Sequence, residues 1–300
     1  LSQRGRGSRA ERNAKLILTV GVLGVSASAI LVRFSQAPSG VTAAYRLGWT
    51  VLLLLPVVLL RCRAELRRVT ARDLVLCGAS GVLLALHFLT WFESLKRTSV
   101  ASSTVLVSTE VIFTALGFAL FLHGKIPRLG VWAILLAFGG SALLALSGGG
   151  GAGELSGNLL ALAAASAAAV YTLIGRIQRG HLSTTVYTFL TYLACFLTLL
   201  LGTAAAGTPL TGYGGREWLI GLALAVLCTL LGHSLFSWCL KYLSPSYVSA
   251  AKLCEPVFSS LAAIPLFGEV PGPLQLAGGA AVLGAVLLYT WAEREKTPAG

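Results

Sequence analysis

Lys252 and Glu255 are two ionisable residues in an otherwise apolar stretch, HSLFSWCLKYLSPSYVSAAKLCEP, which runs from residue 233 to 256. Residues i and i+3 share one face of a helix, so this ammonium and this carboxylate are predicted neighbours. Pro256 follows at once, and we expect it to weaken the helical ladder and free carbonyl groups nearby. Together these groups suit a zwitterionic ligand; the alternative is a structural ion pair between helices.

The scarce polar residues recur along the chain. At a constant offset of 145, SLKRTSVASSTVLVSTEVIFTAL (94–116) aligns with CLKYLSPSYVSAAKLCEPVFSSL (239–261), so that Lys96 meets Lys241 and Glu110 meets Glu255. Just upstream, HFLTWF (87–92) is similar to HSLFSW (233–238), with the alignment shifted by one residue from the offset of 145. Leu- and Ala-rich sequences align easily by chance. Lys, Glu and His are scarce in this chain, so their alignment is less easily explained by chance, and the pattern predicts an internal repeat.

These residues and their aromatic neighbours are the candidates for a binding site. An ionisable side chain at the centre of a membrane span costs about 2.5 to 3.5 kcal/mol, and it persists best facing a cavity or a partner. The His residues could instead bond between helices, and the Trp residues could belong to the interfacial belt. Arg46, near the end of its span, is expected to snorkel to the headgroups. The predicted substrate-binding residues are His87, Trp91, Glu110, Tyr171, His233, Trp238, Tyr247, Lys252 and Glu255.

The elements that must position these residues are apolar helices. The chain has 300 residues, of which 56% are hydrophobic and 11% charged, whereas soluble domains carry about 25% charged residues. Its apolar runs do not alternate with polar residues as the strands of a membrane β-barrel would. We predict an all-α membrane protein with ten transmembrane helices, at 15–32, 41–60, 74–92, 99–122, 129–147, 156–175, 184–203, 217–240, 246–267 and 273–292.

The offset maps the first five of these spans onto the last five. Five is an odd number, so the two halves would cross the membrane in opposite directions, which is the inverted repeat of many secondary transporters. The predicted parts are an N-terminal tail (1–14), a first five-helix repeat (15–147), a Gly-rich linker (148–155), a second repeat (156–292) and a C-terminal tail (293–300). Such repeats place a substrate site near the midplane, between the halves.

The net charge of +12 is distributed as a topology signal. Most of the 23 Lys and Arg fall on the side of the N-terminus, and the other side receives Arg33, Lys96, Arg97 and Arg216. This bias predicts cytoplasmic termini and argues against a nucleic-acid partner. The N-terminal apolar run imitates a secretory signal but continues past Ala27-Ser28-Ala29, so we expect it to be retained. The six cysteines lack metal-binding spacing, and we expect no metal, disulfide or cofactor.

The segment LCEPVFSSLAAIPLFGE (253–269) resembles the penultimate-helix signature of the drug/metabolite transporter superfamily, EamA type. That signature has an early Pro and a closing Gly-Glu pair, matched here by Pro256 and Gly268-Glu269. The first half departs from it, with Val111 in place of the Pro and His123-Gly124-Lys125 in place of the Gly-Glu. Within the superfamily the chain is most similar to the YddG amino-acid exporters.

The resemblance implies ten helices in inverted halves around a central cavity in the bacterial inner membrane. It also implies export of aromatic and other amino acids, as small-molecule substrates, across the lipid bilayer. We expect the protein to be a monomer. We expect spans one, three, four, six, eight and nine to enclose the cavity, with spans five and ten peripheral. An amino acid could then bridge Glu110 and Lys252. The exact substrates, proton coupling and resting conformation are not predicted.

Two other classes of function remain to be weighed. Gly78-Ala79-Ser80-Gly81 matches the GxSG of rhomboid-type intramembrane serine proteases, with His233 as the possible base. A Ser–His pair needs hydrogen-bond reach and an oxyanion site, and ten spans do not fit that class. A channel or membrane scaffold is the other alternative, although no charged ring or filter-like loop is visible.

Overall fold

The computed structural model describes residues 2–121, 126–147, 152–178, 180–233, 235 and 253–294. Within these ranges the chain is helical and contains no β-strand. The helices are α1 (Ser2–Phe34), α2 (Ser39–Arg61), α3 (Arg63–Leu66), α4 (Ala71–Arg97), α5 (Val100–Val107), α6 (Glu110–Phe121), α7 (Arg128–Ser147), α8 (Ala152–Gln178), α9 (Thr184–Ala205), α10 (Gly215–Ala223), the π-helix η1 (Leu224–His233), α13 (Cys254–Phe267) and α14 (Pro273–Arg294).

Eight segments of the described chain are long and apolar enough to cross a membrane. They comprise α2, α4, α8, α9, most of α1 and α14, the α5–α6 pair, and α10 with η1. Two shorter apolar helices lie at Arg128–Leu144 and Cys254–Phe267. Each predicted span overlaps one of these segments, so the all-helical membrane class is confirmed. The count of ten complete crossings stays a prediction.

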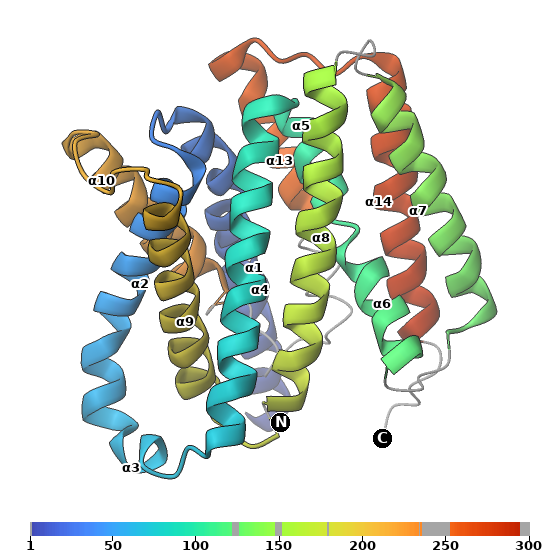
Figure 1. The fold of residues 1–300 in the computed structure, drawn as a ribbon. Helices are drawn as coiled ribbons and strands as arrows, with labels where there is room; N and C mark the ends of the chain where they lie inside the picture. The colour runs from blue at the N-terminus through green and yellow to red at the C-terminus, as the bar shows by residue number, and fades with distance from the viewer. Residues whose placement is uncertain are drawn as a thin grey trace.

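The helices form a bundle with two distinct ends (Figure 1). The start of α1, the short helix α3 and the end of α14 lie at one end, which we call the termini end. The start of α2, the loop before α10 and the loop between α13 and α14 lie at the opposite end, the far end. In the middle α4 packs along α8 and α9, while α7 and α14 pack together at one edge.

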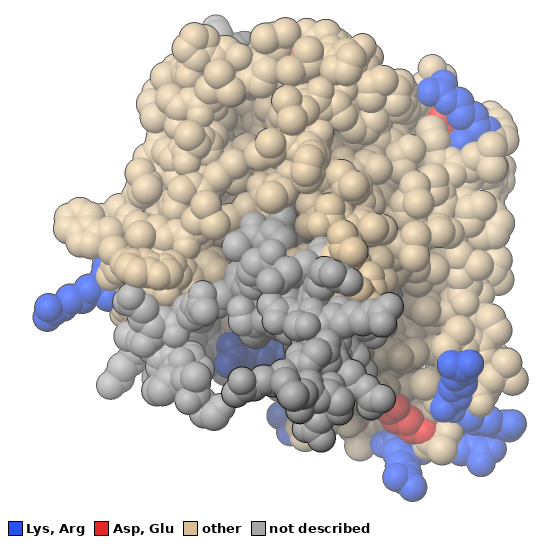
Figure 2. Space-filling view, turned by 180° about the vertical axis from the view of Figure 1, so that it is seen from behind, with Lys and Arg blue, Asp and Glu red and all other residues tan. Residues whose placement is uncertain are grey.

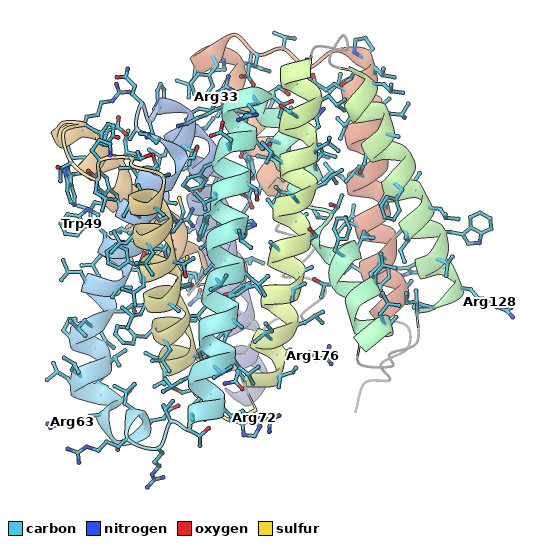
Figure 3. The ribbon with its side chains drawn as sticks, viewed as in Figure 1. Arg33, Trp49, Arg63, Arg72, Arg128 and Arg176 are labelled. Carbon is cyan, nitrogen blue, oxygen red and sulfur yellow. The ribbon has the colours of Figure 1, made fainter. Side chains whose placement is uncertain are left out.

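The basic residues are divided between the two ends. Figure 3 places Arg63, Arg72, Arg128 and Arg176 toward the termini end and Arg33 at the far end. In the view from behind, the Lys and Arg side chains lie mostly in the lower part, below a broad surface that carries few of them (Figure 2). An uncharged band between charged ends is what a bilayer requires.

The edge pair α7 and α14 is held by close backbone contact. A Cβ added at Gly278 would lie 2.9 Å from Gly140 O, and one added at Gly140 would lie 2.9 Å from Gly278 O. The two helices therefore meet where neither has a side chain, the small-residue packing that is common between membrane helices.

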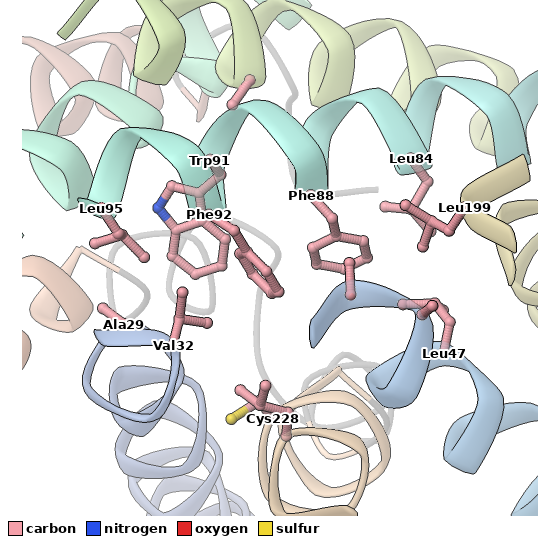
Figure 4. Packing of buried hydrophobic residues seen from close by; sticks show 14 of the residues in the cluster. Ala29, Val32, Leu47, Leu84, Phe88, Trp91, Phe92, Leu95, Leu199 and Cys228 are labelled. Carbon is pink, nitrogen blue, oxygen red and sulfur yellow. The ribbon is translucent and has the colours of Figure 1, made fainter. Parts of the chain in front are cut away.

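The main cluster of buried apolar residues joins α4 to its neighbours (Figure 4). Phe88, Trp91 and Phe92 of α4 form a row of neighbouring rings, with Phe92 5.6 Å from each of the other two. Ala29 and Val32 of α1 lie against this row. The row therefore fixes α4 as the central helix of the bundle, and Trp91 continues from the cluster to the wall of the cavity described next.

Candidate functional site

A break at Ser108 and Thr109 divides the predicted fourth span into α5 and α6. Ser108 Oγ donates to Thr104 O at 2.9 Å, and Thr109 Oγ1 donates to Leu106 O at 2.6 Å. Hydroxyls that bond to the preceding turn compete with the helical ladder and bend or end helices. The predicted span over 99–122 overlaps the apolar segment Val100–Gly117 but consists of two helices. Glu110, expected in mid-span, begins the second of these helices.

A cavity of about 330 Å³ lies beside this break. Its described wall comes from α4, α5, α6, α8, α13 and α14, together with the residue that precedes α13. Most of the lining side chains are polar, charged or aromatic, although they lie within an apolar bundle. They are Trp91, Thr104, Val107, Ser108, Glu110, Val111, Thr114, Ala115, Thr172, Leu173, Arg176, Leu253, Glu255 and Tyr289.

Two carboxylates that the repeat places at equivalent positions line this one cavity. Glu110 lies in the first turn of α6, and Glu255 lies in the first turn of α13. A helix N-terminus stabilises negative charge, so each carboxylate has a favourable position. Thr172 Oγ1 of α8 donates to Glu110 Oε1 at 2.8 Å. Arg176, one turn further along α8, adds a guanidinium to the same wall.

The structure places the predicted site residues in two layers. Trp91, Glu110 and Glu255 line the cavity. His87 lies behind Trp91, with the two rings stacked at 5.8 Å, and its Nδ1 is 3.0 Å from Ala164 O of α8. Tyr171 packs against the main buried cluster and does not belong to the described cavity wall. His87 is therefore placed to orient Trp91.

The remaining predicted residues cannot be placed in the cavity. His233 ends η1, but its side chain is outside the described part of the structure. Trp238, Tyr247 and Lys252 lie outside the described residues altogether.

Sequence reasoning missed several polar residues of the wall. Thr104 and Ser108 come from α5 and the break, Thr172 and Arg176 from α8, and Tyr289 from α14. Tyr289 corrects the expectation that the tenth span is peripheral. Among the described residues, none from α1, α10 or η1 lines the cavity, although spans one and eight were expected to enclose it. Arg176 alone had a signal in the sequence, because it occupies a span end that matches the position of Arg33.

Pro256 does not act as the sequence suggested. It is the third residue of α13 and lies in the first turn. A proline there removes an N–H that has no partner within the helix, so the ladder is not weakened. Its carbonyl accepts a hydrogen bond of 2.6 Å from Ser260 Oγ. A second proline, Pro265, lies inside α13 near its opposite end, and the helix continues through it to Phe267.

Arg46 is buried in the bundle, contrary to the expectation that it snorkels to the headgroups. Only 2% of the residue is exposed. Its Nε donates to Thr229 Oγ1 of η1 at 2.9 Å, and its Nη1 donates to Ser28 Oγ of α1 at 3.1 Å. The guanidinium lies over the ring of Phe88, 4.4 Å from the ring centre. A buried cation held by hydroxyls and a ring face joins α1, α2, α4 and η1.

The GxSG sequence of α4 packs helices together. Ser80 is buried, and its hydroxyl is 2.7 Å from the hydroxyl of Tyr187 on α9. A Cβ added at Gly81 would lie 2.5 Å from Ala194 Cβ. The motif is accounted for by the close approach of α4 to α9.

Apolar helices of membrane-spanning length around a polar cavity are the architecture of a polytopic membrane protein. The EamA-like transporter family matches the chain twice, over residues 14–146 and 155–291. The chain belongs to this family, which confirms the resemblance of the 253–269 segment. It is a membrane transporter and not an enzyme.

Named relatives are exporters. The pseudopaline exporter CntI of Pseudomonas aeruginosa is 24% identical over 207 residues, which cover 69% of this chain and 72% of the relative. A probable terminal-alkyne amino-acid exporter of Streptantibioticus cattleyicolor is 28% identical over 233 residues, covering 74% and 75%. A crystal structure with 19% identity superposes with a TM-score of 0.61 over 94% of this chain and 98% of that one, which supports the fold.

Proposed function

We propose that this protein exports amino acids, or closely related small metabolites, across the bacterial inner membrane by alternating access. The observation that carries the proposal is the meeting of Glu110 and Glu255 in one cavity, because they come from equivalent positions in the two halves. Carboxylates in a membrane interior face a cavity or a partner, and an amino acid offers an ammonium as that partner. The names of the two exporter relatives agree with this substrate class.

The substrate carboxylate needs a cation at the same site. Arg176 lines the cavity, and Lys252 lies three residues before Glu255 in the sequence. A guanidinium binds a carboxylate through two parallel hydrogen bonds, whereas an ammonium acts as a point charge. In our proposal Glu110 binds the substrate ammonium and Arg176 or Lys252 binds its carboxylate. Trp91 and Tyr289 contact the side chain loosely, which gives broad specificity.

The architecture proposed for this activity is a pair of inverted five-helix repeats, 15–147 and 156–292, joined by the linker 148–155. The two family matches, 14–146 and 155–291, support these boundaries. The excess of basic residues at the termini end supports cytoplasmic termini. The functional unit is a monomer in the bilayer.

The test is uptake into proteoliposomes with a panel of amino acids, with and without a pH gradient. Glu110→Gln and Lys252→Ala should each lower transport about tenfold or more, because a hydrogen bond to a charged group is worth about 1.5 to 3 kcal/mol. Glu154→Gln is the matched control, since Glu154 also lies in the first turn of an apolar helix but is not part of the described cavity wall.

The same assays also distinguish between the possible roles of Lys252. Normal transport by Lys252→Ala would assign the substrate carboxylate to Arg176. Misfolding of Lys252→Ala that Glu255→Gln rescues would identify a structural ion pair. No transport of any amino acid by the unmodified protein would reject the substrate class.

A further inference from the structure

We propose that Arg33 and Glu269 form a latch that holds the far end closed, and that the protein therefore rests open toward its termini end. The inference rests on the proposed alternating access and orientation. It assigns a function to two residues outside the cavity wall and gives a direction to the resting state.

Arg33 is placed to close the far end because, from the end of α1, it reaches the ends of two other helices, α4 and α13. Its Nη1 donates to Leu95 O and to Thr98 O, the latter at 3.1 Å, and these carbonyls end α4. Its Nη2 pairs with Glu269 Oε1. The side chains of Arg33 and Glu269 are only 24% and 18% exposed, so water screens the pair less than it screens a surface pair.

Glu269 completes the contact from the other half of the chain. Its Oε2 accepts a hydrogen bond of 2.8 Å from Val100 N, the first residue of α5. The guanidinium therefore meets the carbonyl end of α4 and the carboxylate meets the amide end of α5, which matches both helix dipoles. The latch thus bridges the corner between α4 and α5 while it ties α1 to α13.

The backbone holds Glu269 in this position. Gly268 ends α13 with φ of 68°, a left-handed conformation that favours glycine. Gly268 N donates to Ile264 O at 2.9 Å, and Glu269 N donates to Ala263 O at 3.4 Å. This helix-ending motif directs the chain back toward α1. The Gly-Glu pair found in the sequence is therefore one device, in which the glycine turns the chain and the glutamate binds Arg33.

Aromatic and amide contacts reinforce the same closure. The rings of Phe34 and Phe267 lie 5.1 Å apart, and the Arg33 guanidinium lies 5.4 Å from the centre of the Phe267 ring. Gln275 Nε2 of α14 donates to Ser99 Oγ at 2.6 Å. An opening between α1 and α13 at the far end would have to break the charged pair and separate these rings.

The glutamate of this pair is not repeated in the sequence of the first half. Under the offset of 145, Glu269 corresponds to Gly124. The cavity extends from Trp91 and Thr104 to Arg176, which lies toward the termini end (Figure 3). In an alternating-access cycle, a far end that is held closed leaves the cavity to be reached from the termini end.

Labelling of a cavity cysteine tests the latch without any substrate. Ser108→Cys places a thiol in the cavity wall, and the parent chain supplies the background from the native cysteines. A membrane-impermeant maleimide added to intact cells should label this thiol slowly. Adding Glu269→Gln should raise the labelling rate about tenfold, because a charged hydrogen-bond partner is lost. Arg33→Lys should give a smaller rise, since one ammonium cannot replace the fork of a guanidinium.

The matched control is the ion pair of Glu93 and Arg97, which join at 2.8 Å within α4 at the same end of the bundle. Arg97→Gln should leave the labelling of Ser108→Cys within twofold of the parent, because it removes only an exposed pair within one helix and keeps the hydrogen bond from Ser39 Oγ to Glu93. Gly215→Cys, in an exposed position at the far end, should label rapidly from outside and so reports orientation.

The outcomes separate the latch from the proposed function. Unchanged outside labelling in folded Glu269→Gln and Arg33→Lys variants would overturn the latch. Rapid outside labelling of Ser108→Cys in the otherwise unmodified chain would also overturn it. Failure of Gly215→Cys to label would reject the orientation instead. Absence of amino-acid transport, with labelling as expected, would reject the substrate class and leave the latch standing.

Discussion

The two segments related by the offset of 145 carry the same glutamate and build different helices around it. In the first half, hydroxyls at Ser108 and Thr109 end α5, and Glu110 starts α6. In the second half, Glu255 lies in the first turn of α13, followed by Pro256. Both carboxylates reach one cavity. The two halves therefore share a helix start at the glutamate. The first half reaches it with hydroxyls that bond to the preceding turn, and the second half has a proline in the first turn.

The comparison predicts its largest effect for a proline inside α5. Val105→Pro should cost about 3 kcal/mol or more, because residue 105 is in the helix interior and its N–H is part of the ladder. Thermal unfolding in detergent, with size-exclusion chromatography, should show loss of the monodisperse protein. An intact, stable Val105→Pro protein would mean that α5 is not a continuous helix.

A double-mutant cycle tests whether the two glutamates act on one ligand. Glu110→Gln and Glu255→Gln should each reduce transport about tenfold, and the double variant should lose much less than the product of the two effects. Residues that contact one ligand are coupled by about 0.5 to 3 kcal/mol, whereas independent sites add. Strict additivity in initial rates of proteoliposome uptake would show that the two halves bind different groups.

We expect the smallest effect on stability and transport when Val111, in the first half, is replaced by proline, the residue at the equivalent position of the second half. Val111→Pro puts proline in the first turn of α6, as Pro256 is in the first turn of α13. Proline is tolerated at this point of a helix, so stability should change by no more than about 1 kcal/mol and transport by less than about twofold. Val111→Pro that is as damaging as Val105→Pro would indicate one continuous helix from α5 through α6.

Hydropathy predicted the apolar helices well because a bilayer imposes length and composition on each crossing. It could not predict the break at Ser108 and Thr109, since both residues also occur inside helices and only the local hydrogen bonds decide. Among the site residues, Glu110 was found because the repeat duplicates it. Thr172 escaped notice because its role depends on α8 lying beside α6, which no local pattern encodes.

The position of Arg46 shows the same limit from another side. Arg46 lies seven residues into α2, and this distance from the helix end alone predicts that its side chain reaches the lipid headgroups. Its partners, Ser28 and Thr229, come from two other helices and are small hydroxyl residues with no distinctive spacing. The Arg33–Glu269 pair likewise joins residues 236 positions apart. Contacts between helices that are far apart in the chain could therefore not be predicted from the sequence.

The break between α5 and α6 also affects how the protein enters the membrane. α5 has 8 residues and α6 has 12, so at about 1.5 Å per residue neither can cross a hydrocarbon core of about 30 Å alone. Residues Val100–Gly117 nevertheless form one apolar stretch with a mean hydropathy of 1.5. We therefore expect the translocon to recognise α5 and α6 as a single insertion signal. The two helices would then enter the bilayer together, and the cavity would gain its polar edge when the neighbouring helices assemble around them.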